Sequence, residues 1–85
     1  MTKKSKYKLT LYIPETYQIK VPGLLDKRWS DWNKEMTVTV EYNGYGEPIT
    51  ILTGTLDQAA LQGLLRKLYS LGLPLISVEW VESLE

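Results

Sequence analysis

Apolar and polar residues alternate along five segments of the chain, a pattern that is typical of β-strands with one buried side. The segments are residues 7–13, 17–21, 36–42, 49–53 and 75–80. Pro22 and Gly23 end the second segment, and the turn sequence NGYGEP joins the third to the fourth as a hairpin. In the fourth segment we expect Ile51 to face the core and Leu52 to face outward.

A short helix is predicted between the second and third strands. The sequence LLDKRWSDWNKE places Leu25, Trp29 and Trp32 at helical spacing, so that the three side chains share one side of the helix. Asp26 is a candidate N-cap, because its carboxylate can accept from the first free backbone N–H groups. We therefore expect the two tryptophans to pack in the core.

A longer helix is predicted from residue 55 to residue 71. Its first residues, TLDQ, match a capping box in which the Thr55 hydroxyl accepts from the backbone N–H of Gln58. Gly72 stands where a left-handed C-cap belongs, and Pro74 prevents continuation of the helix. The apolar face of this helix consists of Ala60, Leu61, Leu64, Leu65, Leu68 and Leu71.

From residue 17 onward the elements follow the order strand, helix, strand, strand, helix, strand. This is the β-α-β-β-α-β pattern of the ferredoxin-like fold, an antiparallel sheet with two helices on one face. We expect the strands at 17–21 and 49–53 to be the inner ones. The chain is thus predicted to consist of a basic tail, residues 1–5, and one α+β domain, residues 6–85, whose core is 17–81.

The strand predicted at residues 6–13 has no place in this arrangement, because the strand at 17–21 already has a neighbour on each side. An alternating strand without a partner in its own chain is suited to strand addition between subunits. We therefore expect a homo-oligomer, and a dimer before larger assemblies. The side chains that we expect at its interfaces are Tyr7, Leu9 and Leu11 of this strand, Leu52 and Leu75 on the open face of the sheet, and Trp80 of the last strand.

Gly63 is an unfavourable residue for the middle of a helix, where glycine costs about 0.5–1 kcal/mol relative to alanine. Together with Ala59 it forms a strip of small residues beside the leucine face. We expect Trp29 or Trp32 of the short helix to lie over this strip. Contact of the strip with a partner or a ligand is the alternative.

Composition narrows the possible chemistry. The 85 residues include no cysteine and no histidine, which removes thiolate chemistry, the commonest general base and the commonest transition-metal ligand. No nucleophile–base pair and no metal-ligand spacing is present, so we predict a non-enzymatic protein without cofactor or metal. No apolar run has the length of a membrane span and no signal peptide is visible, so we expect a cytoplasmic protein without a membrane partner.

Charge is distributed unevenly, although the chain as a whole is neutral. The first eight residues carry +4, from Lys3, Lys4, Lys6 and Lys8, which leaves −4 on residues 9–85. Such a tail can bind nucleic acid or simply increase solubility. The acidic body opposes phosphate binding, and the positions expected to face outward on the inner strands (Gln18, Lys20, Thr50 and Leu52) offer no aromatic ring for base stacking. Nucleic-acid binding through the tail is therefore the weaker alternative, and a small-ligand or enzymatic module at a subunit interface is the other.

Two stretches of the sequence carry a resemblance to a known family, LTGTLDQAALQGLLRKLYSLGLPLISVE and, upstream of it, VPGLLDKRWSDW. They resemble a family of small uncharacterised bacterial and archaeal proteins with a DQAALHGLL helix followed by an LGLPLLSV strand. The similarity runs from about residue 17 to residue 81. Gln62 stands where the family usually has His, so any role of that His as a base or metal ligand does not apply to this chain. The resemblance implies no particular activity.

Overall fold

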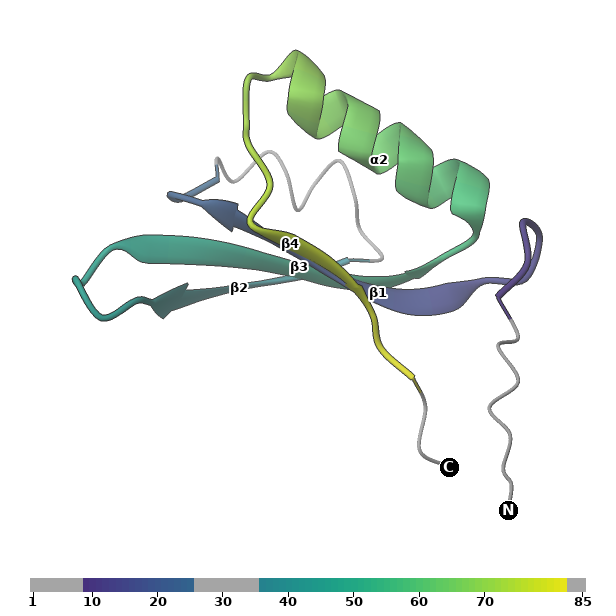
Figure 1. The fold of residues 1–85 in the computed structure, drawn as a ribbon, viewed down its shortest axis with the longest axis horizontal. Helices are drawn as coiled ribbons and strands as arrows, with labels where there is room; N and C mark the ends of the chain where they lie inside the picture. Colours follow the sequence, from purple (N-terminus) through teal and green to yellow (C-terminus); the bar gives the residue numbers. More distant parts are fainter. Residues whose placement is uncertain (1–8, 26–35, 83–85) are drawn as a thin grey trace.

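The protein contains a four-stranded antiparallel sheet with a helix on one of its faces (Figure 1). The computed structural model describes residues 9–25 and 36–82. Its elements are β1 (Glu15–Pro22), β2 (Thr37–Tyr42), β3 (Pro48–Leu56), α2 (Gln58–Ser70) and β4 (Ser77–Trp80). The strand order is β2-β3-β1-β4, which confirms the prediction that the strands at 17–21 and 49–53 are the inner ones.

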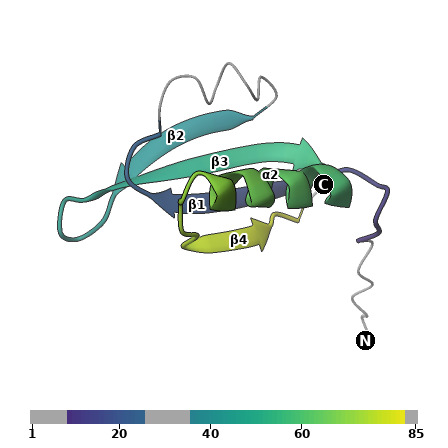
Figure 2. The same cartoon turned by 90° about the horizontal axis from the view of Figure 1, so that it is seen from above.

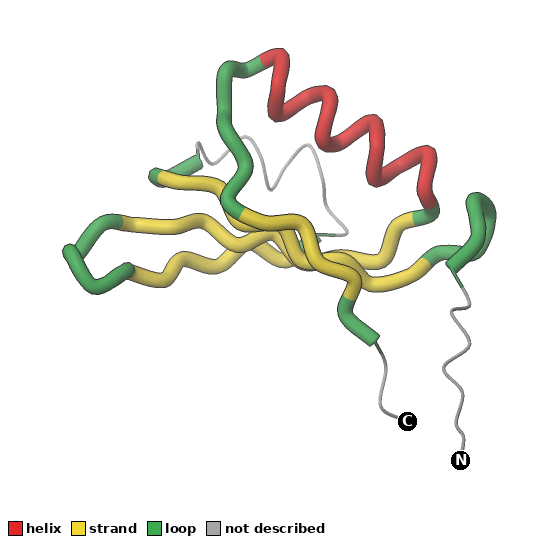
Figure 3. Tube along the Cα trace, in the orientation of Figure 1, coloured by secondary structure: helices red, strands yellow, loops and turns green. Residues whose placement is uncertain are grey.

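The predicted ferredoxin-like fold, with two helices and an additional strand, is wrong. Within residues 9–25 and 36–82 the structure contains α2 as its one helix (Figure 3). The predicted helix with Trp29 and Trp32 lies outside the described residues. Residues 9–13 form a bend and no strand, because the Thr10 hydroxyl accepts from the backbone N–H of Tyr12 at 3.2 Å and of Ile13 at 3.0 Å. A local hydrogen bond of this kind competes with the ladder of a sheet.

The core lies between the sheet and α2. Figure 2 shows α2 lying over β1 and β3. Every second residue of β1 contributes a side chain, as the period of a strand requires, and α2 contributes leucines at intervals of three and four residues. The buried cluster consists of Tyr17, Ile19, Val21, Met36, Leu52, Leu61, Leu64 and Leu68.

The side chains that β3 directs toward the core are the set that we predicted to face outward. Leu52 pairs with Ile19, and opposed residues of an antiparallel ladder share a face, so Leu52 points toward α2 and is only 1% exposed. Ile51, which pairs with Lys20, is buried on the other face and is not part of the core cluster. We call this other face, away from α2, the open face. Because residues 49–52 (ITIL) have apolar side chains in both alternating positions, their pattern did not specify the inward set.

Thr50 is the polar residue that this orientation buries. Its side chain is 0% exposed, and its hydroxyl donates to the carbonyl oxygen of Gly23 at 2.6 Å. The N–H of Gly23 donates to the carbonyl oxygen of Pro48 at 2.9 Å. Two hydrogen bonds therefore tie the residue after β1 to the first part of β3. Gly23 has φ of 88°, a conformation that glycine adopts without steric cost.

The N-cap of α2 is Asp57, where we predicted Thr55. The Asp57 carboxylate accepts from the backbone N–H of Ala60 at 2.8 Å. Thr55 cannot cap the helix because β3 continues through Leu56. The Thr55 hydroxyl lies instead 3.3 Å from the hydroxyl of Thr16, its partner in β1.

The C-terminus of α2 ends as predicted. Gly72 has φ of 78°, and the N–H of Leu73 donates to the carbonyl oxygen of Leu68 at 3.0 Å. This bond closes a Schellman motif, and Leu73 packs against the core beside it. The motif turns the chain from the helix toward β4.

Candidate interaction edge

Strand β4 forms one edge of the sheet, and apolar surface is exposed along it. No strand of the described residues lies beyond it (Figure 2). Edge strands in soluble proteins are commonly protected by lysine or proline, and the four residues of β4, SVEW, include neither. The exposed apolar side chains of β4 and of the chain on either side of it are Leu71, Leu75, Ile76, Val78 and Val81. We refer to these residues with β4 as the β4 edge.

The two sides of β4 differ in chemistry. Val78 pairs with Ile19 and therefore points to the α2 side of the sheet. Ser77 and Glu79 point to the open face, where Glu79 is opposed by Gln18. An incoming strand would thus meet apolar side chains on one side and polar side chains on the other.

The backbone of β4 is held to β1 at both ends. The N–H of Ile76 donates to the carbonyl oxygen of Lys20 at 2.7 Å, and the N–H of Val81 donates to that of Thr16 at 2.8 Å. Alternate residues of an antiparallel strand direct their N–H and C=O groups to the same neighbour. The bond from Val81 places residues 77, 79 and 81 in the set whose N–H and C=O groups face β1, so Val78 directs its N–H and C=O groups to the outer edge. Ile76, just before the strand, also donates to β1 and interrupts the alternation there.

The structure separates the interface residues predicted on the sheet. Leu52 is buried beneath α2, so the prediction that it faces outward is wrong. Leu75 is exposed in the loop that joins α2 to β4, the loop drawn in green in Figure 3. Trp80 is partly buried against the core, and its indole N–H donates to Glu15 Oε1 at 3.3 Å. Of these three residues, Leu75 lies in the exposed part of the β4 edge.

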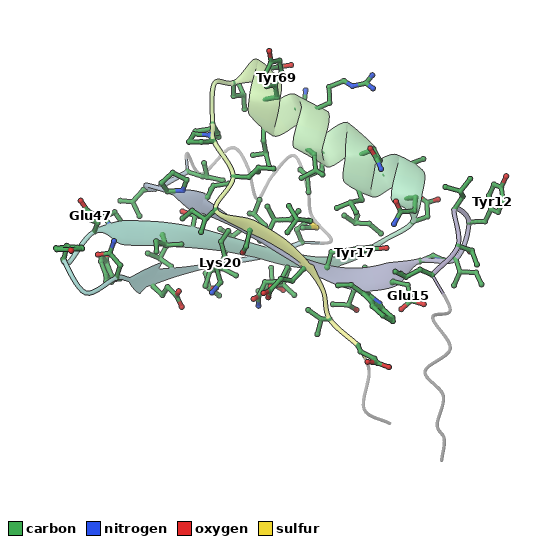
Figure 4. All side chains as sticks on the ribbon, viewed as in Figure 1. Tyr12, Glu15, Tyr17, Lys20, Glu47 and Tyr69 are labelled. Carbon is green, nitrogen blue, oxygen red and sulfur yellow. The ribbon has the colours of Figure 1, made fainter. Side chains whose placement is uncertain are left out.

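The bend at residues 9–13 carries Leu9 and Leu11, two of the three remaining predicted interface residues. Leu9, Leu11 and Ile13 are exposed, and Leu11 keeps 63% of its surface. Figure 4 shows Tyr12 pointing away from the sheet. Tyr7 lies outside the described residues. An exposed apolar segment thus precedes β1.

The small-residue strip on α2 is exposed at both of its members, Ala59 and Gly63. A Cβ added to Gly63 would meet no atom of the described residues within 4 Å. The contact that we predicted with Trp29 or Trp32 falls on residues outside the described part of the chain, and it stays a prediction.

An ion pair lies on the open face of the sheet. Lys20 Nζ lies 3.5 Å from Glu41 Oε2, and the pair spans β3 beside Ile51, which is 9% exposed. Both charges are partly exposed, so the pair itself adds little stability. On this face the inner strands present Gln18, Lys20, Ile51 and Thr53. These four positions include no aromatic ring on which a base could stack.

A hydrogen-bonded chain of Tyr17, Gln58 and Gln62, which we did not predict, links β1 to α2. Gln58 Nε2 donates to the hydroxyl of Tyr17 at 2.8 Å, and Gln62 Nε2 lies 3.4 Å from Gln58 Oε1. Tyr17 is buried and Gln62 is exposed, so the chain runs from the core to the surface. The signal was a tyrosine at an inward strand position, since a buried hydroxyl needs a partner. The arrangement positions the first turn of α2 on β1.

Comparison with protein families assigns the chain. A family model described as "Domain of unknown function (DUF8691)" matches residues 16–79. The chain belongs to the DUF8691 family. The predicted resemblance to an uncharacterised family is therefore confirmed. No match was found among the curated proteins or among the solved structures.

The DUF8691 domain accounts for most of the described structure. The match includes all of β2, β3 and α2, and it ends at Glu79, within β4, whereas residues 9–13 precede it. No helix in the described part of this DUF8691 chain is long and apolar enough to cross a membrane. Among the same residues, no three His, Cys, Asp or Glu side chains are grouped so that they could hold a metal ion.

Proposed function

We propose that this DUF8691 chain is a non-enzymatic interaction module that self-associates through the β4 edge. The observation that carries the proposal is the exposed apolar surface of an edge strand, with Val78 on the strand and Leu75, Ile76 and Val81 beside its ends. Addition of a strand to such an edge combines main-chain hydrogen bonds with side-chain contacts. We expect the assembly to be a homodimer with a regulatory role.

Burial of the β4 edge supplies the driving force. Full burial of an aliphatic side chain is worth about 1.5–3 kcal/mol, and Ile76 keeps 50% of its surface exposed, so covering it contributes about 1 kcal/mol. Burial of four such side chains, together with the new ladder hydrogen bonds, contributes several kcal/mol to the free energy of association. The loss of translational and rotational freedom on association opposes this contribution. This balance is typical of a reversible dimer, whose population rises with concentration.

Ile76→Asp tests the proposal. We expect the wild-type chain to sediment as a dimer at high concentration, and the variant to stay monomeric, because a carboxylate at an apolar contact loses its hydration on association. Tyr45→Asp is the matched control, since Tyr45 is exposed in the β2–β3 turn, away from β4. Circular dichroism establishes that both variants keep the wild-type secondary structure.

Two results would contradict the proposal. A wild-type chain that sediments as a monomer over a hundredfold range of concentration excludes self-association under those conditions. A dimer that Ile76→Asp leaves intact places the contact on a different surface.

A further inference from the structure

We infer that residues 6–13 of one copy add as an antiparallel strand to the outer edge of β4 in a second copy. The inference rests on the proposed self-association, and it names the segment that each copy contributes. The receiving edge lies almost entirely within the DUF8691 match, and the contributed segment lies before it.

The alternation of the segment matches the two sides of the β4 edge. If Leu9 stands opposite Val78, then Leu11 stands opposite Ile76, and both apolar pairs lie on the α2 side. The same register places Thr10 opposite Ser77 and Lys8 opposite Glu79 on the open face. A shift by one residue would place Leu9 and Leu11 among polar partners, so the side-chain pattern excludes it.

Charge favours the same pairing. The first eight residues carry +4, whereas residues 9–85 carry −4. In the stated register Lys8 lies opposite the exposed carboxylate of Glu79. Opposite charges directly across two strands are favourable, and complementary potentials also accelerate the encounter of two copies.

Ser77 supplies an independent observation. Its hydroxyl oxygen is buried and has no hydrogen-bond partner among the described residues. A buried hydroxyl without a partner is unfavourable. Because this oxygen is buried within its own copy, the Ser77 side chain must change rotamer before it can bond to the Thr10 hydroxyl, which stands opposite residue 77 in the added strand. Among residues 9–25 and 36–82, the Thr10 hydroxyl accepts from the exposed backbone N–H groups of Tyr12 and Ile13. Those N–H groups can turn to water or to the new ladder when the bend opens.

The reach of the chain requires a second copy. With Leu11 opposite Ile76, Leu11 lies level with Lys20, to which the N–H of Ile76 is bonded. In its own chain, Leu11 is four residues before Glu15 and can reach at most about 14 Å from it. Along β1, Lys20 is five residues from Glu15, which is about 17 Å, and the added strand lies two strand spacings, about 9–10 Å, to the side. The segment therefore cannot make this antiparallel pairing with its own β4.

Disulfide cross-linking tests the register on a chain that has no cysteine of its own. Thr10 and Ser77 form a non-hydrogen-bonded pair in the stated register, where Cα atoms approach to about 4.5 Å, a distance that a disulfide spans. We mix full-length Thr10→Cys with full-length Ser77→Cys under mild oxidation and identify the mixed dimer by its intact mass. The matched control replaces Thr10→Cys with Leu11→Cys, whose side chain projects from the opposite face. We expect at least a tenfold greater yield of mixed dimer from the first pair, and equal yields would overturn the inference.

A charge exchange tests the pairing of Lys8 with Glu79 without oxidation. We expect Lys8→Glu and Glu79→Lys each to weaken the dimer by about fivefold, and an equimolar mixture of the two variants to recover most of the wild-type affinity. Arg66→Glu on the exposed surface of α2 changes the net charge by the same amount as Lys8→Glu and should leave the affinity unchanged.

Different results would contradict the proposed function and the pairing of residues 6–13 with β4. A wild-type chain that is always monomeric overturns the proposed function and this inference together. A wild-type dimer that resists Lys8→Glu, Glu79→Lys and Leu11→Asp overturns this inference alone, because the copies then meet without residues 6–13. Leu11→Asp leaves the monomer unaffected, since the Leu11 side chain is mostly exposed there.

Discussion

The buried hydroxyl of Thr50 is the most direct test of how β3 is oriented. Thr50→Val removes the hydroxyl and keeps the branched shape, so the packing volume at this 0% exposed position hardly changes. The hydrogen bond to the Gly23 carbonyl, 2.6 Å long, is lost. If Thr50 faced solvent, as the sequence pattern led us to expect, the same substitution would have almost no effect.

The expected loss can be estimated from the structure. Leaving the Gly23 carbonyl without this donor costs about 1–3 kcal/mol, and the methyl group that replaces the hydroxyl returns about 0.8 kcal/mol of burial. The net destabilisation is therefore about 0.2–2 kcal/mol. For a domain of this size each kcal/mol lowers Tm by about 4–8 °C, so a decrease of about 1–15 °C is expected.

Urea unfolding monitored by circular dichroism measures the change. All samples are kept at one protein concentration, because self-association makes apparent stability depend on concentration. The midpoint should fall while the slope of the free energy of unfolding with urea stays the same, which indicates an unchanged surface exposed on unfolding. Thr39→Val is the matched control, since Thr39 is exposed on the open face of β2. Equal stability of Thr50→Val and Thr39→Val would refute the account of Thr50.

Three further substitutions on or beside α2 separate the cap, the flank and the helix end. Asp57→Ala should destabilise the fold by about 1 kcal/mol, because it removes the bond to the backbone N–H of Ala60. Thr55→Ala should cost less stability. A larger loss of stability from Thr55→Ala than from Asp57→Ala would indicate that Thr55 is the N-cap after all. Gly63→Ala should stabilise the fold by about 0.5–1 kcal/mol, and destabilisation would reveal a close neighbour on that flank. Gly72→Ala should cost about 1–2 kcal/mol because φ is 78°, and an unchanged thermal melt would contradict the Schellman motif.

The elements that the sequence predicted well are those with one unambiguous apolar set. β1 has Tyr17, Ile19 and Val21 on one side, and all three are buried. The leucines of α2 recur at helical spacing, and Gly72 marks its end. Strand order also followed from sequence, since the connections between these elements leave few arrangements open.

The errors arose where a local pattern competed with a distant contact. Apolar residues occur at both alternating positions of residues 49–52, and the bond that decides between them joins Thr50 to a residue 27 positions away. The bond between Gln58 and Tyr17 spans 41 positions and left no periodic signal. Residues 9–13 alternate like a strand, but β1 has a neighbour on each side, so no adjacent place in the sheet remained for them.

The exposure of the residues that we placed at an interface was predicted in part for the same reason. Leu75 and Leu11 are exposed as expected, because each lies in a segment whose exposure does not depend on the choice of face in β3. Leu52 was misplaced together with its strand. The unpaired hydroxyl of Ser77 could not be predicted, since it depends on burial that only the folded sheet produces.

The central position of β1 has a consequence for the order of folding. β2 and β3 are joined by a short turn and can pair early, but the contact between Glu15 and Trp80 spans 65 positions. Closing so long a loop is slow, and β1 has an uncovered edge until residues 77–80 arrive. A nascent chain would therefore hold its earliest strand exposed longest, and a chaperone that binds extended apolar segments would find its target there.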